Sequence, residues 1–466
     1  MPTCLIDPTP DAIAVSTVAE DAYAAWLAAQ DAAARDWLAM AGFKGKGGQA
    51  ALIPGSGGRP RAVYVIGGHE GRGGPWAWCG LGAGLPDGAY RIEAELDANQ
   101  AHDAALGFAL ARYRYDRYRS PSAEDGTRDG PRLAWPEGCD RDAVKAAYGA
   151  TKLVRDLINT PASDLGPAEL AVAIKELAGA SGAQFREVVG VDLIREDFPA
   201  VYAVGRGAED ARAPRLVDFT WGRDDAPRVT LVGKGVTFDS GGLDIKPASA
   251  MKLMKKDMGG AAHALGVASM VMAANLDVRL RVIVAAVENS VSGSAMRPLD
   301  VVATRKGVSV EIGHTDAEGR VILSDALALA SEDQPDVIID FATLTGAARV
   351  ALGTDLPALF CNDDALAAAL LAAGARTADP LWRMPLWKGY KPQIKSSVAD
   401  IKNDTDSPYG GAITAALFLE EFVTPGTAWA HIDLMAWNTA SQPGRPEGGE
   451  AMTLRAVFAM LAERFA

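Results

Sequence analysis

The sequence predicts an α/β fold in which a small N-terminal α/β domain is followed by a larger α/β domain with a mostly parallel, doubly covered sheet. Apolar strands alternate with helical segments along the last two-thirds of the chain, which is typical of a sheet buried on both faces. The chain also has 466 residues, more than one hydrophobic core usually holds, and this length favours two domains.

Residues 1–119 are predicted to form the small domain, residues 120–139 a linker, and residues 140–466 the larger domain. Residues 120–138 are rich in Pro, Gly, Ser and Asp and lack periodicity, as connecting segments do. In the first domain, hydrophobic periodicity predicts strands at Thr3–Ile6, Ala50–Ile53, Ala62–Ile66 and Tyr90–Leu96, and helices at Thr17–Met40 and Ala98–Tyr118.

The larger domain begins with a predicted helix from Asp140 to Leu157, and a second helix begins at Ala168. Its strands are predicted at Phe185–Val189, Arg215–Thr220, Arg228–Val232, Leu280–Val287, Val308–Ile312, Val337–Phe341, Ala358–Phe360 and Trp429–Leu434. Further helices are predicted at Gly260–Ala274, Gly319–Ala330, Asp363–Ala373, Gly411–Phe422 and Leu454–Arg464. Ligands of such sheets bind beyond the carboxyl ends of the strands, where we expect Lys234, Asp316 and Thr343.

Composition limits the classes of partner. The net charge of -13 argues against non-specific binding to nucleic acid or to an anionic membrane. The four cysteines are scattered without metal-ligand or disulfide-framework spacing, and we find neither a signal peptide nor a run of about 18 apolar residues. We therefore expect a cytoplasmic protein with reduced thiols.

The run Arg112–Arg119 alternates cations with tyrosines. Such a run can stack on single-stranded nucleic acid, or it can be the end of an amphipathic helix packed on its own domain. In a strongly acidic chain we favour the packed helix and do not expect a nucleic-acid partner.

Charged residues follow the predicted strand Arg228–Val232 in a glycine-rich loop that carries Lys234, Asp239 and Lys246. Charges at the end of a buried strand are costly unless they are paired or bind a metal. Downstream, Asp316, Glu318 and Arg320 alternate, so that in an extended segment they would share a face.

Together with Asp239 and Asp257, this second segment brings the number of carboxylates to four. A dry pocket tolerates so much negative charge only if divalent cations neutralise it, and two cations would suffice. The chain has five histidines and no His-Glu-x-x-His motif, so the ligands are expected to be mainly oxygens.

These motifs together resemble the leucyl aminopeptidase family, which are cytosolic di-metal exopeptidases. The resemblance rests on VGKGVTFDSGG at 232–242, Lys246-Pro247, MKKDMGGAA at 254–262 and TDAEGR at 315–320, and it covers the chain from about Asp140 to its end. It implies that Asp239 and Glu318 bridge two metals, and that Lys234 and Asp257 complete one site and Asp316 the other. The metals would be Zn²⁺ or Mn²⁺.

As a metal ligand Lys234 must be a neutral amine, which a neighbouring dication can enforce; the alternative is a lysine paired with Asp239. The resemblance further implies that a metal-bridging hydroxide attacks the peptide carbonyl. Lys246 would stabilise the oxyanion, and Arg320 would hold a bicarbonate that acts as general base. The alternatives are a solvated surface lysine and a guanidinium that only neutralises Glu318.

The family cleaves peptides at their N-terminus, because a free α-amine can bind one cation while the neighbouring carbonyl faces the other. By resemblance, Met254, Thr343 and Gly346 line the side-chain pocket and Met452 contributes, which implies a leucine-like preference. Buried methionines are also common in ordinary cores. The resemblance also implies a homohexamer.

Three positions depart from the family pattern. His314 stands where the family has Asn, and we favour a core histidine with both nitrogens hydrogen-bonded. Ala451–Arg455 lacks the expected glycine beside the pocket, and the N-terminal domain is shorter than usual. The alternative functions are a di-metal hydrolase of non-peptide amides and a DNA-binding family member; a non-catalytic binding protein is disfavoured because every metal-ligand position is filled.

Overall fold

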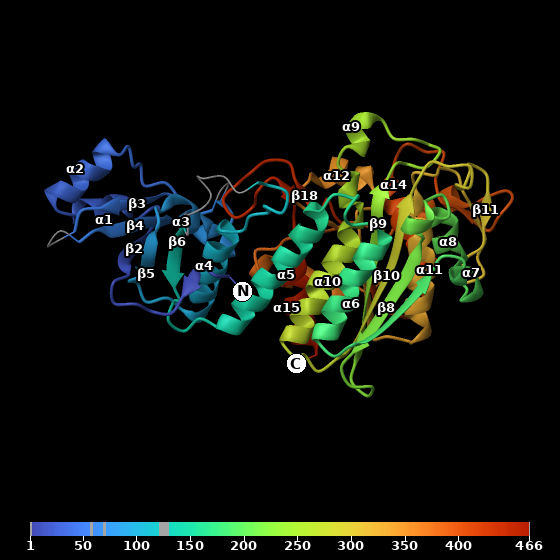
Figure 1. The fold of residues 1–466 in the computed structure, drawn as a ribbon, viewed down its shortest axis with the longest axis horizontal. Helices are drawn as coiled ribbons and strands as arrows, with labels where there is room; N and C mark the ends of the chain where they lie inside the picture. The colour runs from blue at the N-terminus through green and yellow to red at the C-terminus, as the bar shows by residue number, and fades with distance from the viewer. Residues whose placement is uncertain (1, 56–58, 69–70, 121–129, 466) are drawn as a thin grey trace. The chain divides into compact units, whose positions relative to one another are not determined.

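A computed structural model describes residues 2–55, 59–68, 71–120 and 130–465 (Figure 1). The chain forms two compact units, the first of Met1–Lys152 with Ala440–Glu447 and the second of Leu153–Thr439 with Gly448–Ala466. Among the described residues, none of the helices combines the length and the apolar character needed to cross a membrane.

The first unit contains a six-stranded sheet in the order β1-β6-β5-β2-β4-β3, parallel except for β3 against β4. Its strands are β1 (Leu5–Ile6), β2 (Ile13–Ala19), β3 (Ala50–Ile53), β4 (Arg61–Ile66), β5 (Gly88–Ile92) and β6 (Pro131–Ala134). Its helices are α1 (Tyr23–Ala28), α2 (Ala32–Met40), η3 (Gly74–Trp78), α3 (Cys79–Gly84), α4 (Ala98–Ala111) and most of α5 (Arg141–Asn159).

Two helix predictions in this unit were wrong in extent. The segment predicted as one helix, Thr17–Met40, begins as the end of β2 and then divides into α1 and α2, because Asp31 caps α2 by accepting a hydrogen bond from Ala34 N. Helix α4 ends at Ala111, so that the run Arg112–Arg119 lies after the helix rather than within it.

The predicted linker is also partly wrong. Residues 131–134 form β6, which pairs with β1 and β5 in the first sheet and is therefore an integral strand. The composition of the segment concealed this strand, since Arg132 and Pro131 weaken its apolar pattern. Residues 121–129 of the predicted linker lie outside the described residues.

The second unit is built on an eight-stranded sheet in the order β15-β14-β17-β13-β9-β10-β8-β7. The strands are β7 (Gln184–Val189), β8 (Arg215–Trp221), β9 (Arg228–Asp239), β10 (Arg279–Asn289), β13 (Val337–Ala342), β14 (Ala358–Cys361), β15 (Trp382–Arg383) and β17 (Trp429–Asp433). The central strands β10, β9, β13 and β17 are parallel, and antiparallel pairs flank them, which confirms the predicted mostly parallel sheet.

Helices cover both faces of this sheet, as predicted. Figure 1 shows α6 (Pro167–Ala180) and α10 (Gly259–Ala273) on one side of β9 and β10, and α8 (Pro199–Gly205) and α11 (Glu318–Glu332) on the other. A core cluster of this unit includes Phe418, Phe422 and Trp429. Since β9 is buried along almost its whole length, any charged side chain on it needs a partner.

The remaining elements of this unit are shorter or lie at its periphery. They are α7 (Asp192–Arg195), η4 (Asp210–Arg212), α9 (Ala248–Met251), η5 (Met254–Met258), α12 (Gly346–Leu352), α13 (Asp364–Arg376), η6 (Lys388–Ile394), α14 (Gly411–Glu420), α15 (Leu454–Arg464), and strands β11 (Val301–Val302), β12 (Val310–Glu311), β16 (Ile401–Lys402), β18 (Trp437–Asn438) and β19 (Gly448–Gly449). The short elements α7, α8 and α12 were not predicted, because fewer than eight residues give little periodicity.

Candidate metal centre and substrate pocket

A polar pocket of about 270 Å³ in the second unit brings together most of the predicted site residues. All five predicted metal ligands line it, as do Lys246, Arg320, Met254, Thr343 and Gly346. Thr343 directly follows β13, as expected. Asp316 instead follows β12, which ends at Glu311 and belongs to a small three-stranded sheet rather than to the main sheet. Lys234 does not follow a strand, because β9 continues for seven residues beyond its predicted end at Val232 and carries Lys234 inside the strand.

Two features of β9 explain its length and its use. Gly233 and Gly235 allow close packing, because a Cβ on Gly235 would lie 2.6 Å from Ala285 O and one on Gly233 2.5 Å from Ala261 Cα. The register with β10 then shifts by one residue: Val236 pairs with Val287, but Phe238 pairs with Glu288. A regular strand would point residues five apart to opposite faces, and this bulge lets Lys234 and Asp239 serve the same pocket.

Two lysines hold the carboxylates together. Lys234 Nζ lies 2.8 Å from Asp257 Oδ2 and 2.9 Å from Glu318 Oε1. Lys246 Nζ lies 2.8 Å from Asp239 Oδ2 and also contacts Asp316 Oδ1. The alternative interpretation of Lys234 was a lysine paired with Asp239. In the structure, Lys246 is the lysine that pairs with Asp239.

The donor set fits divalent cations. One oxygen each from Asp239, Asp316 and Glu318 can lie within 4.8 Å of one another. Asp257 Oδ2 and Glu318 Oε1 are buried, and beyond their contacts with Lys234 they have no hydrogen-bond donor among the described residues, so each oxygen keeps a lone pair for another ligand. Buried carboxylate oxygens in this state are the donors that hard cations prefer.

The crowding also changes proton affinities. Burial, followed by the charge of Asp239, raises the pKa of Glu318 to about 7. Burial and the charge of Asp257 raise the pKa of Asp239 to about 6. Burial alone would lower the pKa of Lys234, but the charges of Asp257 and Glu318 outweigh it and raise that pKa. Without cations the site therefore holds protons that cations would displace.

The prediction required an extended segment at residues 316–320, and this was wrong. Glu318 and Arg320 belong to the first turn of α11, and Ala317 is its N-cap residue. They still reach the same pocket because the N-terminus of α11 forms part of its wall. Asn403 fixes the preceding turn: its Oδ1 accepts from Gly313 N at 2.8 Å and its Nδ2 donates to His314 O at 2.9 Å.

The interpretation of His314 as a core histidine was wrong. Its side chain is about half exposed, and its Nδ1 accepts a hydrogen bond from Asp316 N at 3.1 Å. The imidazole also lies beside the loop that carries Lys246, because Nδ1 is 3.6 Å from Asp244 Oδ2.

Several supporting contacts were not predicted. Thr343 Oγ1 donates to Asp257 Oδ1 at 2.7 Å, and Asn289 Nδ2 donates to Asp239 Oδ1 at 2.9 Å. Asp433 accepts from Leu344 N at 2.9 Å and from Thr345 Oγ1, and so fixes the loop after β13. Asp433 and Asn289 each end a strand, a position that could have drawn attention to them.

The predicted side-chain pocket is only partly assembled. Met254, Thr343 and Gly346 line the cavity, whereas Met452 is buried and is not among its lining residues. The Met452 N–H instead donates to His263 Nε2 at 2.9 Å. Two cations that sequence reasoning missed, Lys256 and Arg349, also line the cavity.

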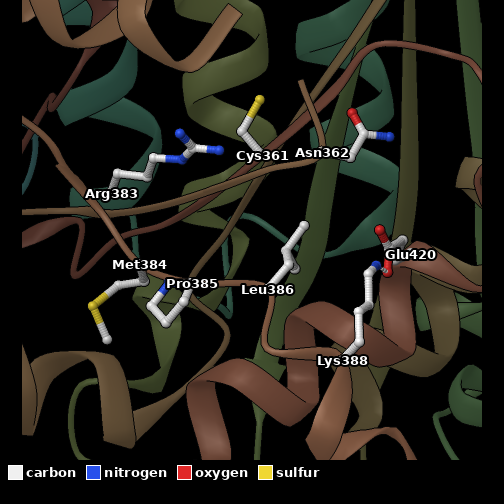
Figure 2. Close-up of a pocket in the computed structure, with 8 residues that line it drawn as sticks. All are labelled: Cys361, Asn362, Arg383, Met384, Pro385, Leu386, Lys388 and Glu420. Atoms are coloured by element: carbon white, nitrogen blue, oxygen red, sulfur yellow. Dashed lines mark hydrogen bonds and ion pairs between the residues drawn. The ribbon is translucent and has the colours of Figure 1, made fainter. Parts of the chain in front are cut away.

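A second cavity, of about 510 Å³, lies by β14 and β15 (Figure 2). Its charged residues are matched: the Lys388 ammonium contacts the Glu420 carboxylate, and the Arg383 guanidinium contacts Asp364. Met384, Pro385 and Leu386 supply an apolar part of the wall.

Family models match both parts of the chain. The model of the cytosol aminopeptidase family catalytic domain matches residues 152–458, and that of the M17 aminopeptidase N-terminal domain matches residues 13–128. The probable cytosol aminopeptidase of Syntrophotalea carbinolica is 41% identical over 373 residues, covering 77% of this chain and 74% of the relative. The probable cytosol aminopeptidase of Synechococcus sp. (strain CC9605) is 35% identical over 472 residues, which cover 93% of this chain and 92% of the relative.

Solved structures agree along almost the full length. The crystal structure of cytosol aminopeptidase from Coxiella burnetii has a TM-score of 0.92 and 46% identity, covering 99% of this chain and 100% of that one. The structure of the bottromycin maturation enzyme BotP in complex with Mn has a TM-score of 0.86 and 35% identity, and the match covers 97% of this chain and 99% of that one.

Proposed function

The chain belongs to the cytosol aminopeptidase family and is an aminopeptidase, and from this premise we propose that it releases single N-terminal residues with the help of two divalent metal ions. The observation that carries the proposal is the convergence of Asp239, Asp316 and Glu318 in one pocket, where one oxygen of each lies within 4.8 Å of the others and Asp257 lines the same wall. The complex of BotP with Mn supports Mn²⁺ as one suitable ion, and the same donors accept Zn²⁺.

In this proposal five residues would hold the ions: Asp239 and Glu318 would be shared by both, Lys234 and Asp257 would complete one site, and Asp316 would complete the other. When bound, the ions supply Lewis acidity that polarises the scissile carbonyl and lowers the pKa of water. The chain itself must release protons for this, since Lys234 has to become a neutral amine and Glu318 a carboxylate. Thr343 and Asn289 then orient Asp257 and Asp239.

Lys246 and Arg320 are the proposed catalytic residues. Lys246 contacts Asp239 and Asp316; with these carboxylates engaged as metal ligands, its ammonium would be available to stabilise negative charge on the carbonyl oxygen. Arg320 is nearly buried, and its Nε lacks a hydrogen-bond partner. Both observations support a guanidinium that binds an anion. A bicarbonate held there would act as general base.

The pocket supports a preference for apolar N-terminal side chains. Met254 and Thr343 provide apolar and flexible surface, and Gly346 leaves space beside them.

We further propose that the protein is a homohexamer. The aromatic side chains of Trp382, Trp387 and Tyr409 are exposed, and this apolar surface supports contacts between subunits. Light scattering of the metal-loaded protein that gives a monomer mass would contradict the assembly.

The test of function uses matched peptides. Metal-loaded protein should hydrolyse Leu-Gly-Gly and leucine p-nitroanilide but not acetyl-Leu-Gly-Gly, should lose activity in chelator and should regain it with Mn²⁺ or Zn²⁺. Elemental analysis should give about two ions per subunit. Cleavage of the acetylated peptide would contradict the exopeptidase mechanism, and cleavage of the anilide but of no peptide would favour a hydrolase of non-peptide amides.

A further inference from the structure

The pocket contains cations that its carboxylates do not neutralise. Its lining includes five cationic side chains and four carboxylates. Lys234 and Lys246 account for all four carboxylates through the ion pairs described above. Within the described residues, Lys256, Arg320 and Arg349 have no carboxylate at ion-pair distance. Arg320 has the role proposed above, and Lys256 and Arg349 have none.

Lys256 and Arg349 occupy one region of the wall. Lys256 lies on η5 and is 2% exposed, although its side chain reaches the pocket. Arg349 lies on α12 one turn after Gly346, and its Nη2 is 3.9 Å from the position that a Cβ on Gly346 would take. Its Nη1 is buried and makes no hydrogen bond. Burial, followed by the positive charge of Arg349, lowers the pKa of Lys256 to about 7, although the charge of Asp257 acts in the opposite direction.

Lys256 is a buried lysine and Arg349 has a buried N–H group without a hydrogen-bond partner, and an anion is the group that satisfies both. A guanidinium presents paired N–H groups that match a carboxylate, and an ammonium adds a point charge beside it. Because Arg349 borders Gly346, such an anion would lie next to the substrate rather than in the metal centre.

We propose that Arg349 and Lys256 form a subsite that binds a carboxylate of the substrate. This inference rests on the proposed function, because it assigns a substrate class to the same pocket. The carboxylate has two possible sources: the side chain of an N-terminal glutamate or aspartate, or the C-terminal carboxylate of a dipeptide. In either case the subsite selects acidic substrates over neutral isosteres, in addition to the apolar contacts of Met254 and Thr343.

The experiment compares isosteric pairs on metal-loaded protein. Glu-Gly-Gly amide against Gln-Gly-Gly amide tests the side-chain source, and Leu-Leu against Leu-Leu amide tests the C-terminal source. For one pair, kcat/KM should favour the acid by about tenfold or more, as expected for a charge-assisted hydrogen bond. In Arg349→Gln this ratio should fall to about one, and Arg349→Lys should retain part of it.

Arg195→Gln is the matched control, since Arg195 is an exposed arginine of the same unit and its variant should keep the wild-type ratio. An unchanged thermal midpoint shows that Arg349→Gln is folded. Inhibition by glutarate, stronger than by glutaramide in wild type and equal in Arg349→Gln, supports the subsite without relying on turnover. The proposal is overturned if wild type hydrolyses Leu-Gly-Gly but favours neither acid, or if Arg349→Gln keeps the preference. Failure of wild type to cleave any peptide would instead reject the proposed function.

Discussion

Two cavities among the described residues of the second unit differ in their charge balance, and their volumes do not indicate this difference. The cavity by β14 and β15 has a volume of about 510 Å³, and the pocket at the carboxylate cluster about 270 Å³. In the larger cavity, Lys388 and Arg383 each have an acidic partner. In the smaller pocket, carboxylates crowd together and cations remain unpaired. The comparison indicates that unbalanced charge, rather than volume, marks the functional site.

The sheet explains why the charges differ. The smaller pocket lies where β9 and β13, two parallel central strands, deliver side chains and loops to one edge. The larger cavity lies beside β14, which runs antiparallel to β17, and beside the short strand β15. Groups that converge from parallel strands must share one small volume, whereas groups at the border of the sheet can turn toward solvent and toward each other.

The largest expected effect comes from removing the catalytic cations of the small pocket. Lys246→Met and Arg320→Met should each lower kcat about 10²- to 10³-fold with little change in KM, because each loses charge stabilisation that matters most in the transition state. Steady-state kinetics on leucine p-nitroanilide measures this. Lys252→Met, at an exposed lysine in the same segment, is the control. Near-normal kcat in both catalytic variants would show that unbalanced charge does not identify catalysis here.

The second prediction concerns the protons held by the crowded carboxylates. Since the pKa of Glu318 is raised to about 7 and that of Asp239 to about 6, each must lose a proton to bind a cation below those values. Apparent Mn²⁺ affinity should therefore fall as the pH falls from 8 to 6, by up to about tenfold per unit for each proton displaced. Calorimetric titration in two buffers of different ionisation enthalpy counts the protons. An affinity independent of pH would contradict the assignment.

A third prediction tests a buried ionisable group whose partners are complete. His263 Nδ1 lies 2.6 Å from Gly259 O and Nε2 accepts from Met452 N, so it should serve stability rather than catalysis. Burial lowers the pKa of His263 to about 4, below the value of about 6.5 in the unfolded chain. The unfolded state thus binds a proton first as the pH falls, and the free energy of unfolding should decrease by about 2 kcal/mol between pH 6.5 and 5 from this group.

Denaturant unfolding of wild type and His263→Gln measures this contribution. The stability advantage of wild type should shrink as the pH falls below 6.5, because the variant lacks the titrating imidazole. An advantage that stays constant from pH 7 to 5 would show that His263 does not titrate as its burial requires. Activity at neutral pH should change little.

Much of this arrangement could be predicted from sequence, and its failures have local causes. The periodicity of apolar strands and helices indicated the sheet and its coverage, and the motifs indicated the residues of the pocket. The extent of β9 was missed because Gly233 and Gly235 look like a loop until the close approach of Ala261 and Ala285 is known. The prediction of an extended segment at residues 316–320 was wrong because helix α11 already begins at Glu318.

What sequence alone could not provide is the pairing of charges. Nothing in the spacing of Lys234 and Lys246 indicates which carboxylates each one meets, since Asp257, Asp316 and Glu318 come from other elements. Likewise, no sequence pattern singles out Arg349. Its significance depends on the structure, in which it lies beside Gly346 and its Nη1 has no hydrogen-bond partner. Charge balance depends on tertiary contacts, and a sequence pattern reports only one element at a time.

The smallest effect is expected in the larger cavity, and it tests the comparison from the opposite side. Lys388 is 57% exposed and pairs with Glu420 at the wall shown in Figure 2. An exposed ion pair contributes about 0–1 kcal/mol, since water screens it and two flexible side chains must be held. The double variant Lys388→Met/Glu420→Gln should thus leave kcat/KM for leucine p-nitroanilide unchanged and shift the unfolding free energy by less than about 1 kcal/mol. A large loss of activity in the folded double variant would mean that matched charges also serve function, and that charge balance does not separate the two cavities.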